Sequence, residues 1–132
     1  MATRALIIGK TKDGLIKYGQ THWDGYQNTE WLKKNMTDIE KIENMFDYMT
    51  TGEDGGHGIS SLSYENYDTN KPKINWYEDS YNCGVTDHWN CSYDDLNQIF
   101  DFPEYISYWD GSDWHDFEID GKTYGEFLKM TS

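Results

Sequence analysis

Carboxylates between residues 74 and 121 are the groups in this sequence best placed to do chemistry. This stretch holds 12 Asp and Glu residues and no Lys or Arg. Carboxylates at alternate strand positions repeat about every 6–7 Å, close to the phosphate spacing along one nucleic-acid strand, and they pair well with arginine. We therefore expect a surface that imitates nucleic acid and binds a basic protein. The residues predicted to contact this partner are Asp94, Asp95, Asp110, Asp113, Asp116 and Glu118.

The charge balance limits the possible partners. The chain has 11 Lys and Arg against 24 Asp and Glu, giving a net charge of -13, and 12 of those charges come from residues 74–121. Such a field repels nucleic acid and anionic membranes and attracts basic surfaces. We expect neither direct nucleic-acid binding nor membrane binding. The simpler alternative is that the acidity only keeps the protein soluble.

Two other kinds of site are compatible with the residues. His22 beside Asp24 could form a catalytic pair with nearby carboxylates, as in a small hydrolase, but no Ser or Cys nucleophile lies next to it in sequence. Cys83, His88 and Cys91 could bind zinc, but a structural zinc site needs four ligands. We favour two reduced cysteines, a structural role for His22, and no cofactor.

A third possibility is a sponge protein that binds a small nucleotide signal. Aromatic side chains would supply its pocket, and the candidates are Trp76, Trp89, Trp109 and Trp114. A nucleotide is anionic, so it would meet a repulsive field unless Arg4, Lys33 and Lys34 came together. We place this function second to protein binding.

The first part of the chain carries a recognisable pair of motifs. Thr3-Arg4-Ala5-Leu6 is followed by His22-Trp23-Asp24-Gly25-Tyr26, in which Asp24-Gly25 predicts a turn and Trp23 and Tyr26 are expected to anchor it in the core. This beginning resembles a family of short uncharacterised phage and mobile-element proteins, although Gln27 stands where that family commonly has Pro. The resemblance implies a phage or mobile-element origin. Small acidic proteins of that origin often inhibit host defence, as anti-CRISPR and anti-restriction proteins do.

Turn signals and apolar spacing predict the elements that would position these residues. Residues 4–9 and 15–22 should form a hairpin around Asp13-Gly14, and residues 105–109 and 114–119 another around Asp110-Gly111. Residues 59–64 and 73–78 read as further strands, and 122–130 as a strand or helix. A capping box at Thr37 and Glu40 begins a helix over 38–49, and Ser92 begins a second helix that ends before Pro103.

Together these elements predict an α+β fold in one domain covering residues 1–132. We expect an antiparallel sheet of about five or six short strands, with the two main helices on one face and an acidic face in water. No apolar run approaches the length of a membrane span or a signal peptide. The predicted protein is thus a cytoplasmic inhibitor of a nucleic-acid-binding host enzyme, and we do not expect it to be an enzyme itself.

Overall fold

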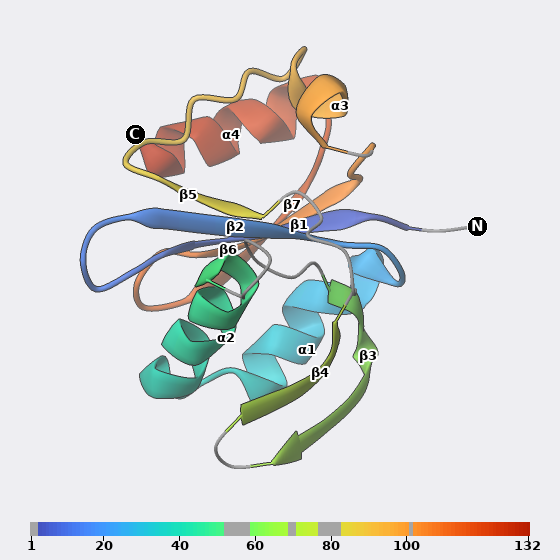
Figure 1. The fold of residues 1–132 in the computed structure, drawn as a ribbon. Helices are drawn as coiled ribbons and strands as arrows, with labels where there is room; N and C mark the ends of the chain where they lie inside the picture. The colour runs from blue at the N-terminus through green and yellow to red at the C-terminus, as the bar shows by residue number, and fades with distance from the viewer. Residues whose placement is uncertain (1–2, 52–58, 69–70, 77–82, 101) are drawn as a thin grey trace.

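The structure, a computed structural model, describes residues 3–51, 59–68, 71–76, 83–100 and 102–132. Its fold is α+β, with a mixed five-stranded sheet in the order β5-β2-β1-β6-β7 (Figure 1). A further hairpin, β3-β4, joins β2 at one corner and brings the hydrogen-bonded sheet to seven strands. The strands are β1 (Ala5–Lys10), β2 (Ile16–Thr21), β3 (Ile59–Asp68), β4 (Lys71–Trp76), β5 (Gly84–Thr86), β6 (Tyr105–Trp109) and β7 (Trp114–Glu118).

The prediction of a purely antiparallel sheet is wrong. The two predicted hairpins form as expected, β1 with β2 and β6 with β7. They meet each other along β1 and β6, which run parallel with Ala5 opposite Tyr105 and Ile8 opposite Tyr108. A short turn fixes pairing within a hairpin, whereas the direction in which two hairpins meet depends on packing between distant segments.

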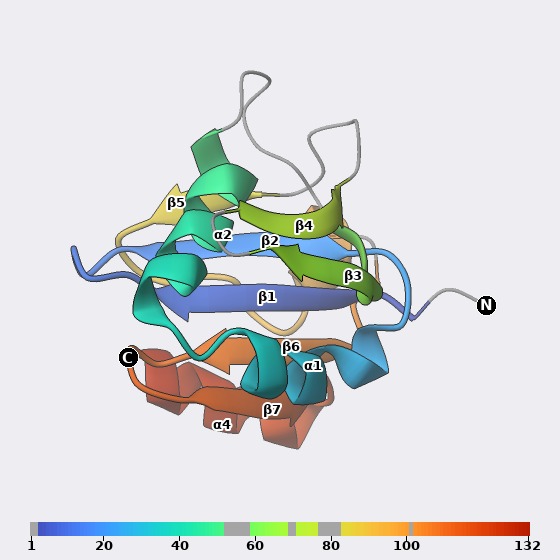
Figure 2. The same ribbon diagram turned by 90° about the horizontal axis from the view of Figure 1, so that it is seen from below.

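The prediction that the helices lie on one face is also wrong. The helices are α1 (Asn28–Asn35), α2 (Ile39–Thr51), α3 (Leu96–Ile99) and α4 (Gly121–Thr131). Figures 1 and 2 show α1 and α2 on one face of the sheet and α3 and α4 on the other. The face that carries Asp116 and Glu118 is therefore not an open face in water, because α1 and α2 cover much of it.

Each face of the sheet has its own apolar core. On the α1 and α2 side, Ile7 of β1 packs in a cluster with Leu32, Phe46 and Trp114. The helix predicted over 38–49 is confirmed as α2, and its Ile42, Met45, Phe46 and Met49 are all buried. Its first turn is capped differently from the prediction, since the Asp38 carboxylate, and not Thr37, accepts a hydrogen bond from the Glu40 amide (2.9 Å).

On the other side, α4 covers β6 and β7. Tyr124 and Phe127 of α4 are buried in a cluster with Leu6 and Ile106. The 122–130 segment is thus a helix, and the Asp120 carboxylate caps it by accepting hydrogen bonds from the amides of Lys122 and Thr123 (3.0 and 2.9 Å).

The second helix predicted from Ser92 is much shorter than expected. It is reduced to the single turn α3, in which Leu96 is buried but Ile99 is 50% exposed. Phe102, after this turn, has a φ of 44°, which an L-residue rarely adopts. The helix ends at Phe100, whose backbone is extended, and so it covers only the middle of the segment predicted between Ser92 and Pro103.

Candidate protein-binding surface

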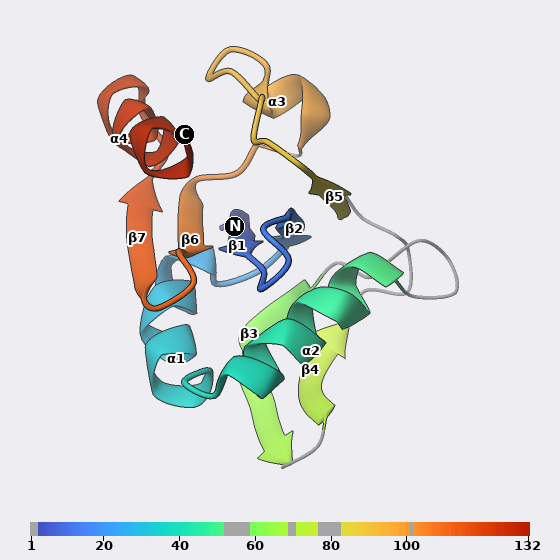
Figure 3. The ribbon, with the colours of Figure 1, turned by 90° about the vertical axis from the view of Figure 1, so that its left-hand side faces the viewer.

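The predicted contact residues of the β6–β7 hairpin lie along the end of the sheet. β7 is the last strand in the order and pairs only with β6 (Figure 3). Asp110 and Asp113 lie in the turn, and Asp116 and Glu118 lie at alternate positions of the strand itself. Asp113, Asp116 and Glu118 are exposed. Three of the predicted carboxylates are therefore presented along one edge.

Asp110 has an internal role in the turn. One of its carboxylate oxygens accepts hydrogen bonds from the amides of Ser112 (2.7 Å) and Asp113 (2.8 Å), and the other lies 2.7 Å from His115 Nε2. Burial raises the pKa of Asp110, but the hydrogen bonds from Asp113, His115 and Ser112 outweigh it, so its pKa is lowered. We conclude that Asp110 shapes the turn and that its charge is mostly satisfied within the protein.

Asp116 is held from the side by α1. The Thr29 hydroxyl donates a hydrogen bond to Asp116 Oδ1 (2.8 Å) and lies 2.6 Å from Ser107 Oγ on β6. Thr29 and Ser107 are buried polar residues, and they orient the Asp116 carboxylate without neutralising it. A role for Thr29 or Ser107 at this site was not predicted from the sequence, because the contacts of Thr29 with Ser107 and Asp116 join segments far apart in the chain. Asn28 also connects α1 to the sheet, since its side-chain amide donates a hydrogen bond to Thr21 Oγ1 of β2 (2.9 Å).

Glu118 differs from Asp116 in having no side-chain hydrogen bond or ion pair within the described part of the chain. Tyr105 of β6 lies opposite it, and exposed Glu104 comes next along the chain. Lys33 lies toward the turn, where it lines an open hollow with Asp113 and Trp114. The Glu118 end of the edge is therefore the more strongly negative end.

Asp94 and Asp95 do not join this row. They precede α3, on the α4 side of the sheet, and both are exposed. Asp94 lines a shallow hollow with Pro103 and Ile119, near the Glu118 end of the hairpin. The six predicted residues thus divide into an edge set of Asp113, Asp116 and Glu118, a separate pair at α3, and Asp110 inside the turn.

The motif at residues 22–26 forms the predicted turn but not the predicted anchor. Asp24 adopts a left-handed conformation with φ of 58°, and the Gly25 amide donates to the Thr3 carbonyl (2.8 Å). A Cβ on Gly25 would lie 2.6 Å from Ala5 Cβ, so close packing on β1 requires glycine here. Trp23 is 43% exposed and Tyr26 55% exposed, so the expectation that they anchor the turn in the core is wrong.

The contacts of the remaining motif residues, His22 and Arg4, are structural. The His22 ring packs edge-on against Trp23, with 4.5 Å between ring centres. Arg4 is half-buried just before β1, and its carbonyl accepts a hydrogen bond from the Glu104 amide (2.8 Å). Arg4 thereby connects the beginning of the chain to the start of β6.

The geometry of the described residues gives little support to the two alternatives, a hydrolase site and a nucleotide-binding pocket. The pair formed by His115 and Asp110 belongs to the turn described above. Trp109 and Trp114 line the hollow beside Lys33, which measures about 560 Å³, but they expose only 6% and 5% of their surfaces. Aromatic rings buried to that degree leave no face on which a nucleotide base could stack. Trp89 packs in the opposite core, and the side chain of Trp76 lies outside the described residues.

Neither Cys83 nor Cys91 is in a disulfide, and burial raises the pKa of the Cys91 thiol. Within the described residues, no three His, Cys, Asp or Glu side chains are arranged to hold a metal ion. None of the helices in the described segments is long and apolar enough to cross a bilayer. His57 and the glycine-rich segment around it lie outside the described residues.

Comparison with known proteins gives no match: no protein-family model, no curated protein and no solved structure matches this sequence.

Proposed function

We propose that this protein binds the basic, nucleic-acid-binding surface of another protein and competes there with nucleic acid. The observation that carries the proposal is the row of exposed carboxylates formed by Asp116 and Glu118 on the end strand of the sheet, with exposed Asp113 in the adjoining turn. Alternate residues of a strand lie about 6–7 Å apart, which is close to the phosphate repeat along one nucleic-acid strand. Arginine and lysine side chains that hold phosphates could bind this row in the same way.

The resemblance of residues 3–6 and 22–26 to phage and mobile-element proteins suggests the biological setting. In that setting the partner is a nucleic-acid-binding enzyme of a bacterial defence system, and the protein acts as an anti-CRISPR or anti-restriction inhibitor. The partner's basic surface faces nucleic acid, so the interaction takes place in the cytoplasm of the host. Inhibition requires only occupancy of that surface and no catalytic group of this protein.

A capture experiment with a matched pair of variants tests the proposal. Tagged protein is incubated with a bacterial lysate, and captured proteins are eluted by rising salt or by duplex DNA and identified by mass spectrometry. We expect a nucleic-acid-binding protein that DNA releases, and we expect Glu118→Lys to weaken its capture about tenfold or more. Asp13→Lys makes the same charge change at an exposed turn at the opposite end of the strands from Glu118 and should leave capture nearly unchanged.

Two results would contradict the proposal. One is a captured partner that neither salt nor DNA releases. The other is an equal loss of capture in Glu118→Lys and Asp13→Lys, because this would make the interaction a response to net charge and not to the β7 edge.

A further inference from the structure

The backbone of β7 has hydrogen-bonding groups that point away from the sheet. In an antiparallel pair, successive residues direct their N–H and C=O groups alternately toward and away from the partner strand. The Asp110 amide donates to the Asp113 carbonyl (3.1 Å) and the Ile119 amide to the Glu104 carbonyl (2.9 Å), which fixes the alternation along this hairpin. The outward groups therefore belong to Trp114, Asp116 and Glu118.

The outward groups at Asp116 and Glu118 are accessible. Both residues are exposed, whereas Trp114 is 5% exposed, and the Glu118 carbonyl already accepts a hydrogen bond from the Asp120 amide (3.0 Å). Figure 3 shows α1 and α4 over the two faces of β7 and no described element beyond its outer edge. The Asp116 N–H and C=O and the Glu118 N–H are thus available to another strand.

We infer that an extended segment of a partner protein, with Arg or Lys at alternate positions and apolar residues between them, adds to β7 as an antiparallel strand. The basic character of the segment rests on the proposed function. The strand geometry rests independently on the orientation of the β7 backbone. Addition of a peptide to an open sheet edge gains affinity from main-chain hydrogen bonds and specificity from alternate side chains.

The alternation of β7 dictates the sequence pattern of the segment. In an antiparallel pair, residues opposite Asp116 and Glu118 lie on the same face of the sheet as those carboxylates, so basic side chains there pair with them. The residue between them lies opposite Phe117, which is 8% exposed and packs in the α4-side core, with the partly buried Ile119 nearby. An apolar side chain suits that position.

Selective backbone methylation of a synthetic peptide tests this geometry. The probe is a short peptide of alternating arginine and valine, and binding is measured by isothermal titration calorimetry at low salt. Methylating the arginine amides removes the donors that face β7 and places methyl groups against the edge. We expect this to raise the dissociation constant at least about tenfold, whereas methylating the valine amides, which face outward, should change it less than about threefold.

Comparison of the three peptides distinguishes strand addition from simple charge attraction. Equal binding by both methylated peptides would overturn strand addition while leaving the acidic surface, and the proposed function, intact. Loss confined to the valine-methylated peptide would overturn the antiparallel register. Absence of binding by the unmethylated peptide would mean that Asp116 and Glu118 only guard the edge against pairing with other chains, as charged edge residues commonly do. Peptide binding without capture of a nucleic-acid-binding protein from lysate would reject the proposed function alone.

Variants of the protein itself test the same geometry, by removing the charges of β7 while keeping its backbone. Asp116→Asn with Glu118→Gln removes the charges and keeps the backbone edge, so affinity for the arginine peptide should fall about tenfold. The ratio between the dissociation constants of the two methylated peptides, at least about threefold, should remain. Asp13→Asn is the control and should bind as the unmodified protein does. Loss of the ratio together with the charges would contradict a backbone contribution.

Discussion

The hairpins β1–β2 and β6–β7 share an Asp-Gly pair in their turns but lie in different environments. Both turns contain Asp-Gly, and the two glycines have positive φ values, 80° at Gly14 and 105° at Gly111. β1 lies between β2 and β6 with helices on both faces, and Ala5 to Ile8 have no exposed surface. Among the described strands β7 has one neighbour, β6, and it contains both buried and exposed residues. The same local signal therefore serves a fully buried strand and an accessible edge.

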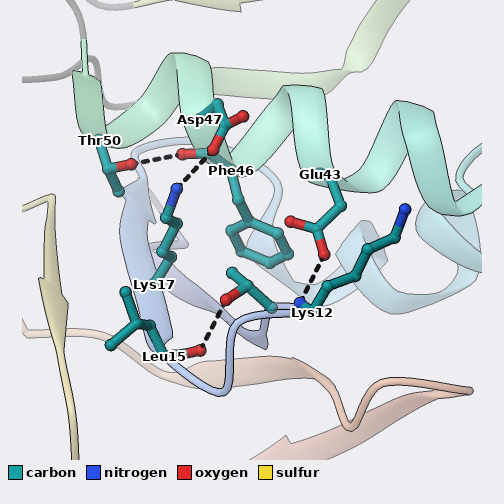
Figure 4. A network of polar contacts seen from close by, with 8 residues as sticks. Lys12, Leu15, Lys17, Glu43, Phe46, Asp47 and Thr50 are labelled. Atoms are coloured by element: carbon teal, nitrogen blue, oxygen red, sulfur yellow. Dashed lines mark hydrogen bonds and ion pairs between the residues drawn. The ribbon is translucent and has the colours of Figure 1, made fainter.

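The charges around the two hairpins differ in a similar way. Near β1 and β2, two of the three acidic residues of α2 have partners: Glu43 accepts a hydrogen bond from the Lys12 amide (2.9 Å), and Asp47 forms an ion pair with Lys17 (Figure 4). At β7, Asp116 has only the neutral hydroxyl of Thr29, and Glu118 has no partner in the described segments. Beside the central hairpin one ion pair thus compensates negative charge within the protein, whereas Asp116 and Glu118 form no ion pair within the described residues.

The largest effect should come from the buried strand. Ile7→Ala removes a side chain with no exposed surface from the core between β1 and α2, and we expect a loss of about 2–5 kcal/mol in the free energy of unfolding. Glu118→Ala on β7 should change it by less than about 0.5 kcal/mol. Urea unfolding followed by circular dichroism measures both. Similar losses in the two variants would break the distinction between centre and edge.

A smaller effect is expected where the chain leaves β2 and packs beside β1. Gly25→Ala would bring Cβ within 2.8 Å of the Thr3 carbonyl oxygen, and moving this backbone should cost about 1–3 kcal/mol. Gly125→Ala is the control, because a Cβ there meets open space within α4 and should stabilise the helix by about 0.5–1 kcal/mol. Thermal unfolding should show melting-temperature shifts of opposite sign. A neutral Gly25→Ala would refute the close packing.

The hydroxyl of Thr29 connects α1 to the edge strand. Thr29→Val removes the donor to Asp116 and leaves the buried Ser107 hydroxyl without that neighbour, so we expect a loss of about 1–2 kcal/mol in unfolding free energy. Thr37→Val makes the same change at an exposed position and should cost less than about 0.5 kcal/mol. Hydrogen exchange measured by NMR should also show faster exchange of β7 amides in Thr29→Val. Equal stability of the two variants would remove the link between α1 and the edge.

The smallest effect should be a pH-dependent contribution from Asp110. Its pKa is lowered in the folded protein, so its ionised form stabilises the fold above its unfolded pKa, near 3.8, and this contribution is lost as pH falls through the folded pKa. Asp110→Asn should therefore cost about 1 kcal/mol or less at pH 7, and the difference from the unmodified protein should shrink toward pH 2. Urea unfolding at a series of pH values measures it. A difference that stays constant with pH would show that the charge of Asp110 is not involved.

Much of the local structure could be predicted because its causes are local. Asp-Gly turns place glycine where positive φ is needed, and the apolar spacing of Ile42, Met45 and Phe46 gives α2 its buried face. The errors occur where local patterns are incomplete. The helix predicted after Ser92 forms only one turn. Trp23 and Tyr26 are exposed because Gly25 makes the close contact of the motif with β1.

The sequence by itself determined that negative charge is concentrated after residue 74, that Asp116 and Glu118 share one side of a strand, and that Asp110 lies in a turn. Only the tertiary structure decided that β1 and β6 pair in parallel, which places β7 at the end of the sheet, and that helices cover both faces. It also separated Asp94 and Asp95 from the edge and brought Thr29 to Asp116. These outcomes depend on contacts between residues far apart in the chain. Which of these contacts form is determined by the need to bury both apolar faces of the sheet at once.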